Sequence, residues 1–128
     1  MKQRIEYWAG LSDYDLETAA AMLTSGRYLY VGYMCHQVIE KILKAFFCKN
    51  SDDPPPYSHN LSYLANRSGL NKIIPSDFSN LINILEPLNI EARYPTYKEQ
   101  LLKSLTYERC REIIEQTKEL QIWVKKRL

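Results

Sequence analysis

The sequence YMCHQVIEKILKAF, residues 33–46, decides the fold of this 128-residue chain. Apolar residues recur through it at helical spacing along two neighbouring rows, which predicts a helix that packs on more than one side. The first row consists of Val31, Met34, Val38, Ile42 and Ala45, and the second of Ile39, Leu43 and Phe46. A helix with this much apolar surface is typical of the centre of a helical bundle.

A polar row interrupts the apolar surface of the same helix. Its members are Gln37, Glu40, Lys41 and Lys44, at positions i, i+3, i+4 and i+7. Glu40 and Lys44 are spaced for an ion pair within the helix, which would stabilise it by about 0.3 kcal/mol. We expect this row to face either water, as a solvated helix face, or a partner, and the sequence leaves both alternatives open.

Composition indicates one domain, residues 1–128, of ordinary globular character. Hydrophobic residues make up 45% and charged residues 25% of the chain, and the net charge of +2 is too small to imply nucleic-acid binding by itself. The three cysteines are widely spaced and the two histidines lie far apart, so we expect neither a disulfide framework, a metal site nor a cofactor. With no signal sequence and no apolar run of membrane-spanning length, we expect a cytoplasmic protein without membrane contact.

The first two helices are predicted over residues 12–25 and 28–50. Ser12 and Asp15 form an S-x-x-D start signal, and Gly26 is a plausible stop between the two helices. Residues 4–8 form an extra turn or join the first helix, with Gly10 as the weak point. Three consecutive prolines at residues 54–56 then break the chain and favour an extended connector.

Three further helices follow the proline-rich connector. A short one is predicted over residues 60–67, and a longer one from residue 76 that Pro87 kinks or divides and that ends before Pro95. The last is predicted over residues 106–127. The resulting fold class is all-α, an up-and-down bundle of four long helices plus one short helix.

Two polar features outside the central helix are candidates for chemistry. His59 follows the connector in YSHNL, residues 57–61, and Arg93 stands in EARYPTY, residues 91–97, flanked by Tyr94 and Tyr97. Taken alone, His59 is more often a structural histidine at a helix start, and Arg93 more often part of a helix end. No phosphate loop and no nucleophilic triad is present.

Taken in order, these features resemble the HEPN family, the nucleotide-binding domain of higher eukaryotes and prokaryotes. Five motifs carry the resemblance and cover nearly the whole chain: DLETA at residues 15–19, SGRY at 25–28, HQVIEKILKA at 36–45, HNL at 59–61, and EARYP at 91–95. The match is to prokaryotic members of the type associated with a minimal nucleotidyltransferase. The resemblance implies a helical bundle, usually homodimeric, often paired with that enzyme in a two-component or toxin–antitoxin system.

Many members of this family are metal-independent ribonucleases with an Arg-x(4–6)-His motif, and this chain departs from that pattern. A motif ending at His36 or His59 would need arginine at residues 29–31 or 52–54, which read LYV and DDP. The motif is therefore absent. No catalytic residue is assigned on this basis, and we expect a protein that binds rather than cuts.

The leading hypothesis is a HEPN protein that binds a nucleotide or RNA in a cleft and pairs with a nucleotidyltransferase. Cationic contacts to phosphate would come from Lys41, Lys44 and Arg93. A base would stack on Tyr94 or Tyr97, and Gln37 and His59 would orient the ligand. Glu40 completes the candidate ligand-binding set.

Two alternatives come from other functional classes. The first is a metal-independent ribonuclease with His59 and Arg93 as its catalytic pair, which requires the fold to bring them together. The second is a purely structural partner, in which the polar row forms interfacial ion pairs.

Overall fold

A computed structural model of the chain describes residues 2–89 and 95–128, with the side chains of residues 95–97 left out. The described part is helical, in the order α1 (Lys2–Thr24), α2 (Tyr28–Asn50), α3 (Leu61–Ser68), α4 (Ser76–Leu85), α5 (Pro95–Ser104) and α6 (Tyr107–Lys125). Two 3-10 turns, η1 (Leu70–Lys72) and η2 (Glu86–Leu88), complete it. The predicted all-helical bundle is confirmed, with three long helices and three shorter ones among the described residues.

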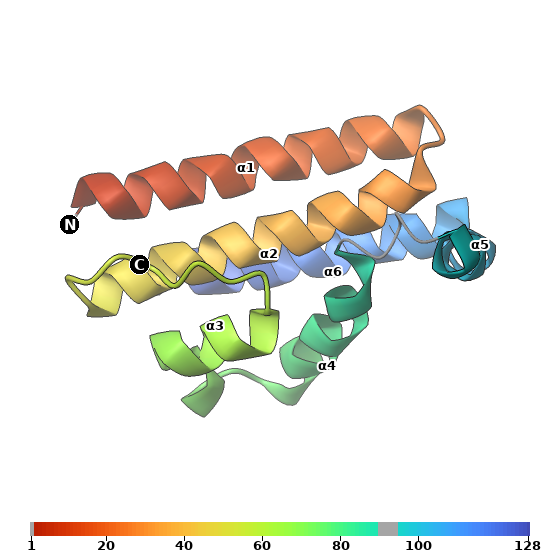
Figure 1. The fold of residues 1–128 in the computed structure, drawn as a ribbon. Helices are drawn as coiled ribbons and strands as arrows, with labels where there is room; N and C mark the ends of the chain where they lie inside the picture. Colours follow the sequence, from red (N-terminus) through yellow and green to blue (C-terminus); the bar gives the residue numbers. More distant parts are fainter. Residues whose placement is uncertain (1, 90–94) are drawn as a thin grey trace.

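Helix α2 lies at the centre of the bundle. It packs along α1 and α6 and contacts α3, α4, α5 and η2 (Figure 1). Both predicted apolar rows of α2 are buried, apart from the partly buried Met34, as expected for a helix with neighbours on several sides. Helices α1 and α2 run in opposite directions, as the predicted up-and-down order requires (Figure 1). Helices α3, α4 and α5 then return the chain to the end of the bundle where α2 begins, so α6 runs in the same direction as α2 (Figure 1).

The predicted helix boundaries are reproduced where capping signals set them. Asn60 caps α3, its side chain accepting a hydrogen bond from the backbone N–H of Tyr63, and Thr106 caps α6 in the same way. Gly26 adopts a positive φ of 77° just after α1, which is the backbone state that glycine permits. Pro87 divides its helix as predicted, since α4 ends at Leu85 and the chain continues as η2.

The predicted start of the first helix at Ser12 was wrong, because α1 runs without interruption from Lys2, through Gly10; of the two alternatives for residues 4–8, the one in which they join the first helix is confirmed. The predicted end of a segment before Pro95 falls at residues 93–94, outside the described residues. Pro95 itself begins α5, a helix that was not predicted from the sequence. Proline suits the first helical position, where its missing N–H has no partner to lose.

Ser12 has a different role, as a buried link between three helices. Its hydroxyl donates to the carbonyl of Val38 on α2 at 2.8 Å and accepts from Nε2 of Gln121 on α6 at 2.9 Å. The side chain is fully buried, so both bonds replace contacts with water.

None of the described helices is long and apolar enough to cross a membrane.

We expect Ser12→Ala to lower the free energy of unfolding by about 1–2 kcal/mol, because the carbonyl of Val38 loses its donor and the amide of Gln121 loses an acceptor. Urea denaturation of Ser12→Ala, Gln121→Leu and the double variant measures the coupling between the two side chains. Strictly additive effects would contradict the proposed link.

Candidate functional site

The carboxylate of Glu40 is the centre of a buried polar cluster on α2. One oxygen, Oε2, accepts from Nζ of Lys44 at 3.2 Å, and the other, Oε1, lies 2.8 Å from Nδ1 of His59. Glu40 is 2% exposed and Lys44 is 7% exposed. The helical spacing of Glu40 and Lys44 therefore produces the predicted ion pair, but inside the protein rather than at its surface.

The rest of the polar row also has its partners within the chain, with Gln37 buried and Lys41 half-buried, which corrects the expectation that the row faces water or a partner. Lys41 donates to Oε1 of Gln37 at 2.8 Å and to Asp15 on α1 at 3.3 Å. Gln37 in turn donates to Asn89 at 3.3 Å. Helix α1 and the chain around η2 thus enclose the row from two sides.

Lys44 also lies against an aromatic ring. Its Nζ is 5.2 Å from the centre of the Trp8 ring on α1, within cation–π distance. Lys44 therefore meets a carboxylate and an aromatic face, and both stabilise its charge in a buried position. Lys41 and Lys44 are each neutralised by a carboxylate of the same chain, so neither is an unpaired cation available to a phosphate.

His59 is the member of the cluster that reaches solvent. Its side chain is 66% exposed, whereas Glu40 beneath it is buried. Because a carboxylate only accepts hydrogen bonds, we assign the proton to Nδ1 of His59. This leaves Nε2, which has no partner among the described residues, as the polar atom that a ligand would meet. A carboxylate that orients an imidazole in this way is a recurring arrangement for acid–base chemistry.

His36 is a second histidine near Oε1 of Glu40 and is fully buried. Its Nδ1 is 4.0 Å from Oε1 of Glu40, and neither ring nitrogen has a hydrogen-bond partner of normal geometry in the described part of the chain. Burial lowers the pKa of His36 from its ordinary 6.5 to about 4, and the nearby Glu40 carboxylate opposes this only in part. His36 is therefore neutral at pH 7 and is not the group that meets a ligand.

The structure brings together five of the eight predicted site residues, namely Gln37, Glu40, Lys41, Lys44 and His59. Arg93 and Tyr94 lie outside the described residues, as does the side chain of Tyr97. Four residues that belong to the cluster were not predicted as site residues: Trp8, Asp15, His36 and Asn89. Asp15 and His36 stand in the quoted family motifs, which was the available signal, whereas nothing in the sequence pointed to Trp8 or Asn89.

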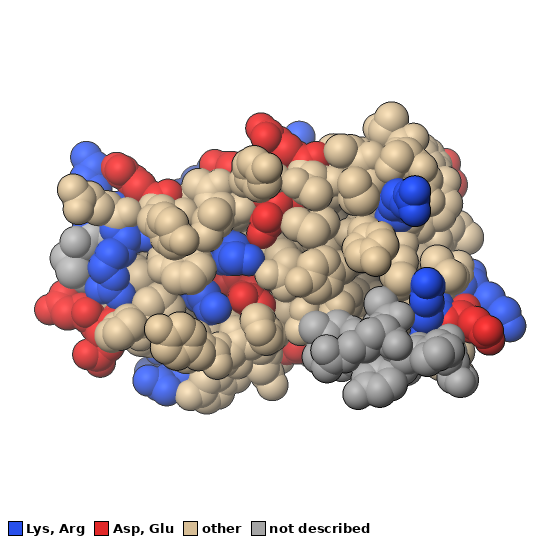
Figure 2. All heavy atoms as spheres, turned by 45° about the horizontal axis from the view of Figure 1, so that its top comes forward, with Lys and Arg blue, Asp and Glu red and all other residues tan. Residues whose placement is uncertain are grey.

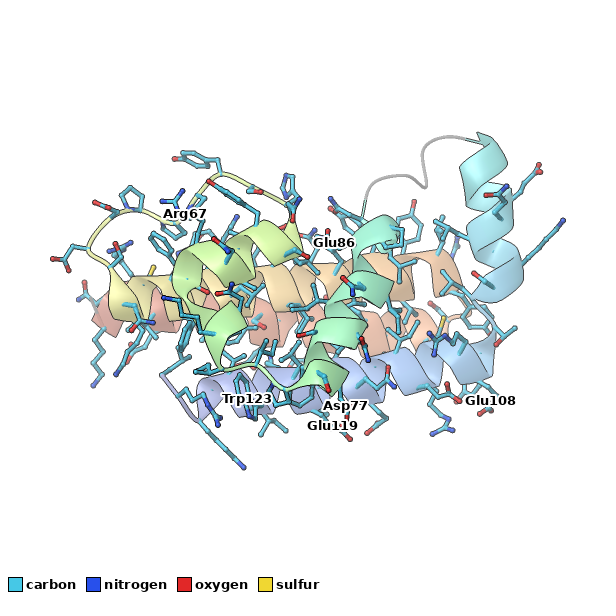
Figure 3. The ribbon with its side chains drawn as sticks, turned by 90° about the horizontal axis from the view of Figure 1, so that it is seen from below. Arg67, Asp77, Glu86, Glu108, Glu119 and Trp123 are labelled. Atoms are coloured by element: carbon cyan, nitrogen blue, oxygen red, sulfur yellow. The ribbon has the colours of Figure 1, made fainter. Side chains whose placement is uncertain are left out.

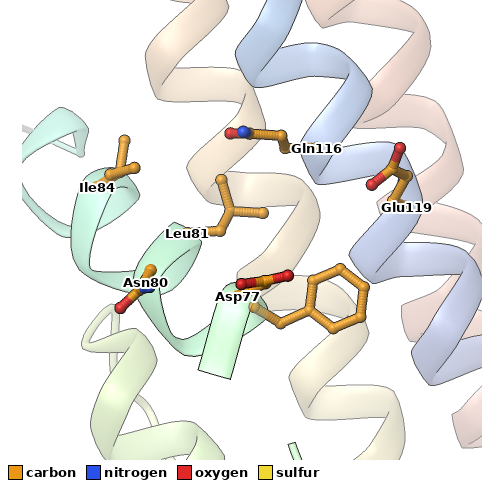
Figure 4. A pocket seen from close by; sticks show the side chains of 7 residues that line it. Asp77, Asn80, Leu81, Ile84, Gln116 and Glu119 are labelled. Atoms are coloured by element: carbon orange, nitrogen blue, oxygen red, sulfur yellow. The ribbon is translucent and has the colours of Figure 1, made fainter. Parts of the chain in front are cut away.

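The hollow between α4 and α6 is a poor alternative site for a phosphate ligand. It has a volume of about 290 Å³, and carboxylates line it from both helices, Asp77 from α4 and Glu119 from α6 (Figure 4). Two carboxylates would repel a phosphate.

In the described part of the chain, no three His, Cys, Asp or Glu side chains lie together in a group that could hold a metal ion.

Fold and site together define a helical-bundle domain whose central helix holds a buried ion pair below an exposed histidine. A family model described as the HEPN domain matches residues 5–127, and the chain belongs to this family. Membership supports a function related to nucleotides or RNA in general. No match was found among curated proteins.

One solved structure shares the whole fold. TT1696 from Thermus thermophilus superposes with a TM-score of 0.83 at 18% sequence identity, and the match covers 98% of each chain. At this level of identity the similarity establishes the fold alone. It shows that the arrangement of α1 to α6 recurs in a protein of distant sequence.

The pKa of His36 predicts how stability depends on pH. The pKa of His36 is 6.5 in the unfolded chain and about 4 in the folded chain, so the unfolded chain binds a proton first as pH falls. The contribution of a neutral His36 to the free energy of unfolding is therefore complete above pH 6.5 and is lost as pH falls toward 4. The groups that face His36 are Glu40, Lys41 and His59.

We expect the free energy of unfolding of the wild type to fall by up to about 3 kcal/mol between pH 7 and pH 4 through His36. His36→Leu, which cannot titrate, should show a correspondingly smaller fall. Urea denaturation at half-unit pH steps measures both, and equal pH dependence in the two proteins would refute the assignment.

Proposed function

We propose that this HEPN protein binds a nucleotide or RNA at the exposed imidazole of His59, and that Glu40 and Lys44 position that imidazole from below. The observation that carries the proposal is the hydrogen bond of 2.8 Å between Nδ1 of His59 and the buried Glu40 carboxylate. It holds the Nδ1 edge of a ring that is largely exposed and leaves Nε2 without a partner among the described residues, which is how a pre-organised ligand contact is built.

The remaining predicted residues keep secondary places in this proposal. Gln37 and Lys41 lie about one turn before Glu40 and Lys44 on α2. Gln37 is hydrogen-bonded to Asn89, and Lys41 to Asp15. Arg93 follows Asn89 by four residues and is the proposed phosphate contact, with Tyr94 or Tyr97 proposed to stack on a base. Lys41 and Lys44 are paired with Asp15 and Glu40, so in this proposal they neutralise these carboxylates near the ligand and do not bind its phosphate as free cations.

A second candidate function is a metal-independent ribonuclease, and the His59–Glu40 pair favours it. In this reaction Nε2 of His59 takes the proton of a ribose 2′-hydroxyl, whose oxygen attacks the adjacent phosphorus. The bond from phosphorus to the 5′-oxygen then breaks, giving a 2′,3′-cyclic phosphate and a 5′-hydroxyl once that oxygen gains a proton. Arg93 would stabilise the charge that develops on the phosphorane.

One experiment separates binding from cleavage. Fluorescence anisotropy of labelled ATP and of a short labelled RNA should show at least about tenfold weaker binding in His59→Ala and Arg93→Ala, and no change in Lys126→Gln, which changes an exposed cation at the C-terminal end of α6. The same RNA incubated in EDTA tests the second candidate, which requires cyclic-phosphate products from wild type and none from His59→Ala. Unchanged affinity in both binding variants would reject the site.

The proposal includes two assemblies, a homodimer and a pair with a minimal nucleotidyltransferase. An apolar groove of about 380 Å³ between α1 and α6, lined by Leu16, Ala20, Leu23 and Ile114 among others, is a surface that supports assembly. Charged side chains of both signs, Glu17, Glu115, Arg111 and Lys118, also line it.

For the homodimer we expect twice the chain mass by light scattering at micromolar concentration, and a shift toward the monomer mass in Ala20→Arg. A change to Arg at Tyr14, an exposed position of α1, is the matched control. The nucleotidyltransferase pair is tested by co-purification after co-expression. A wild-type monomer would remove the homodimer from the proposal.

A further inference from the structure

The connector between α2 and α3, residues 51–60, extends the described site from His59 to three exposed side chains that the proposed function does not use. We propose that this surface, formed by Tyr57, His59, Tyr63 and Arg67 and called here the connector face, binds single-stranded RNA by stacking its unpaired bases. The inference rests on the proposed function and names its ligand as a single-stranded polynucleotide rather than a free nucleotide.

Tyr57 is the first observation. Its side chain is fully exposed, at 104% of the reference area, so its ring contributes nothing to the folded core. The chain turns tightly at this residue, because the N–H of Ser58 donates to the carbonyl of Pro56 at 2.9 Å. Three prolines precede the turn and restrict the backbone, so an apolar ring is presented to solvent on a stiff support.

The connector is fixed at both ends, which is the second observation. Near its start, the guanidinium of Arg4 donates to the backbone carbonyls of Asp52, at 3.0 Å, and Asp53. Near its end, His59 is bound to Glu40. A ligand that binds Tyr57 therefore meets a segment that is already ordered, and the entropic cost of binding is reduced.

Tyr63 and Arg67 are the third observation, one turn apart on α3. Arg67 donates from Nη1 to the hydroxyl of Tyr63 at 2.7 Å, and its guanidinium lies 5.7 Å from the centre of that ring. Both side chains are exposed. No carboxylate of the described residues pairs with Arg67, unlike Lys41 and Lys44, so its charge is available to a phosphate.

The four side chains come from one continuous stretch of chain, residues 57–67. His59 and Tyr57 are two residues apart on the connector, and Asn60 joins the connector to the first turn of α3 by capping Tyr63. Figure 3 places Arg67 beside the connector. The carboxylate of Glu86, which lies near the start of α3, is bound to the N–H of Ser62 at 2.8 Å, so it is already engaged.

This combination of groups fits single-stranded RNA better than a duplex or a free nucleotide. Stacking on aromatic rings requires bases that are not paired, and a chain of nucleotides can occupy both Tyr57 and Tyr63, whereas one nucleotide occupies a single ring. A duplex would need a continuous basic surface. Acidic and basic side chains are instead interspersed over the face shown in Figure 2.

The test is fluorescence anisotropy with a labelled single-stranded RNA of about eight nucleotides, the same sequence as a duplex, and ATP as competitor. We expect Tyr57→Ala and Tyr63→Ala each to weaken binding of the single strand about tenfold. Arg67→Gln should weaken it and reduce the slope of log affinity against log salt by about 0.7. Tyr14→Ala on α1 and Lys126→Gln at the C-terminal end of α6, both at exposed positions, should bind as wild type does.

The outcomes separate this inference from the function on which it rests. Wild-type affinity in both tyrosine variants, with weaker binding in His59→Ala, would overturn the connector face and leave the proposed function standing. Duplex affinity equal to that of the single strand, or ATP competing as well as RNA, would also overturn it. If neither RNA nor ATP binds the wild type, both proposals fail.

Discussion

The structure around the candidate site depends on the burial of one carboxylate, that of Glu40. A buried charge is costly unless a partner compensates it, and Glu40 has two, Lys44 on its own helix and His59 on the connector. The bond to His59 determines where the connector ends, one residue before Asn60 caps α3. Lys44 therefore balances the charge of Glu40, and the contact with His59 satisfies the second oxygen, ties the end of the connector to α2 and orients the imidazole that we propose as a ligand contact.

Helix α2 is part of both the core and the site because it has neighbours on several sides. At one end Gly32 allows close approach, since a side chain there would come within 3.1 Å of Leu88 and 3.5 Å of Leu105. Further along, α1 covers the polar row through Asp15 and Trp8. A polar row under such cover must find its partners within the protein, and the hydrogen bonds of Gln37, Lys41 and Lys44 meet this requirement.

Sequence periodicity and capping signals predicted α2, α3 and α6 well, and the polar row that they set apart on α2 supplies most of the polar cluster around Glu40. They could not show which face of α2 another helix covers. Glu40 and Lys44 therefore suggested a surface pair, although they lie inside. The start of α1 was mistaken because the S-x-x-D pattern at Ser12 also fits a serine that links helices from within. Helix α5 was missed because Pro95 was taken only as a stop, although proline also begins helices. The connector face was not predicted because exposure, not sequence spacing, distinguishes Tyr57 and Arg67.

The two histidines near Glu40 contact the same carboxylate but differ in their exposure to water. His36 is fully buried, so desolvation outweighs the attraction of Glu40, lowers the pKa of the ring and keeps it neutral. His59 meets the same carboxylate at 2.8 Å but stays open to water, so its outer nitrogen remains accessible. Of these two histidines, His59 is therefore the one that a ligand in solvent can reach. The buried ion pair of Glu40 and Lys44 thus belongs to the interior of the fold, whereas the imidazole that it supports lies at the surface where we propose that the ligand binds.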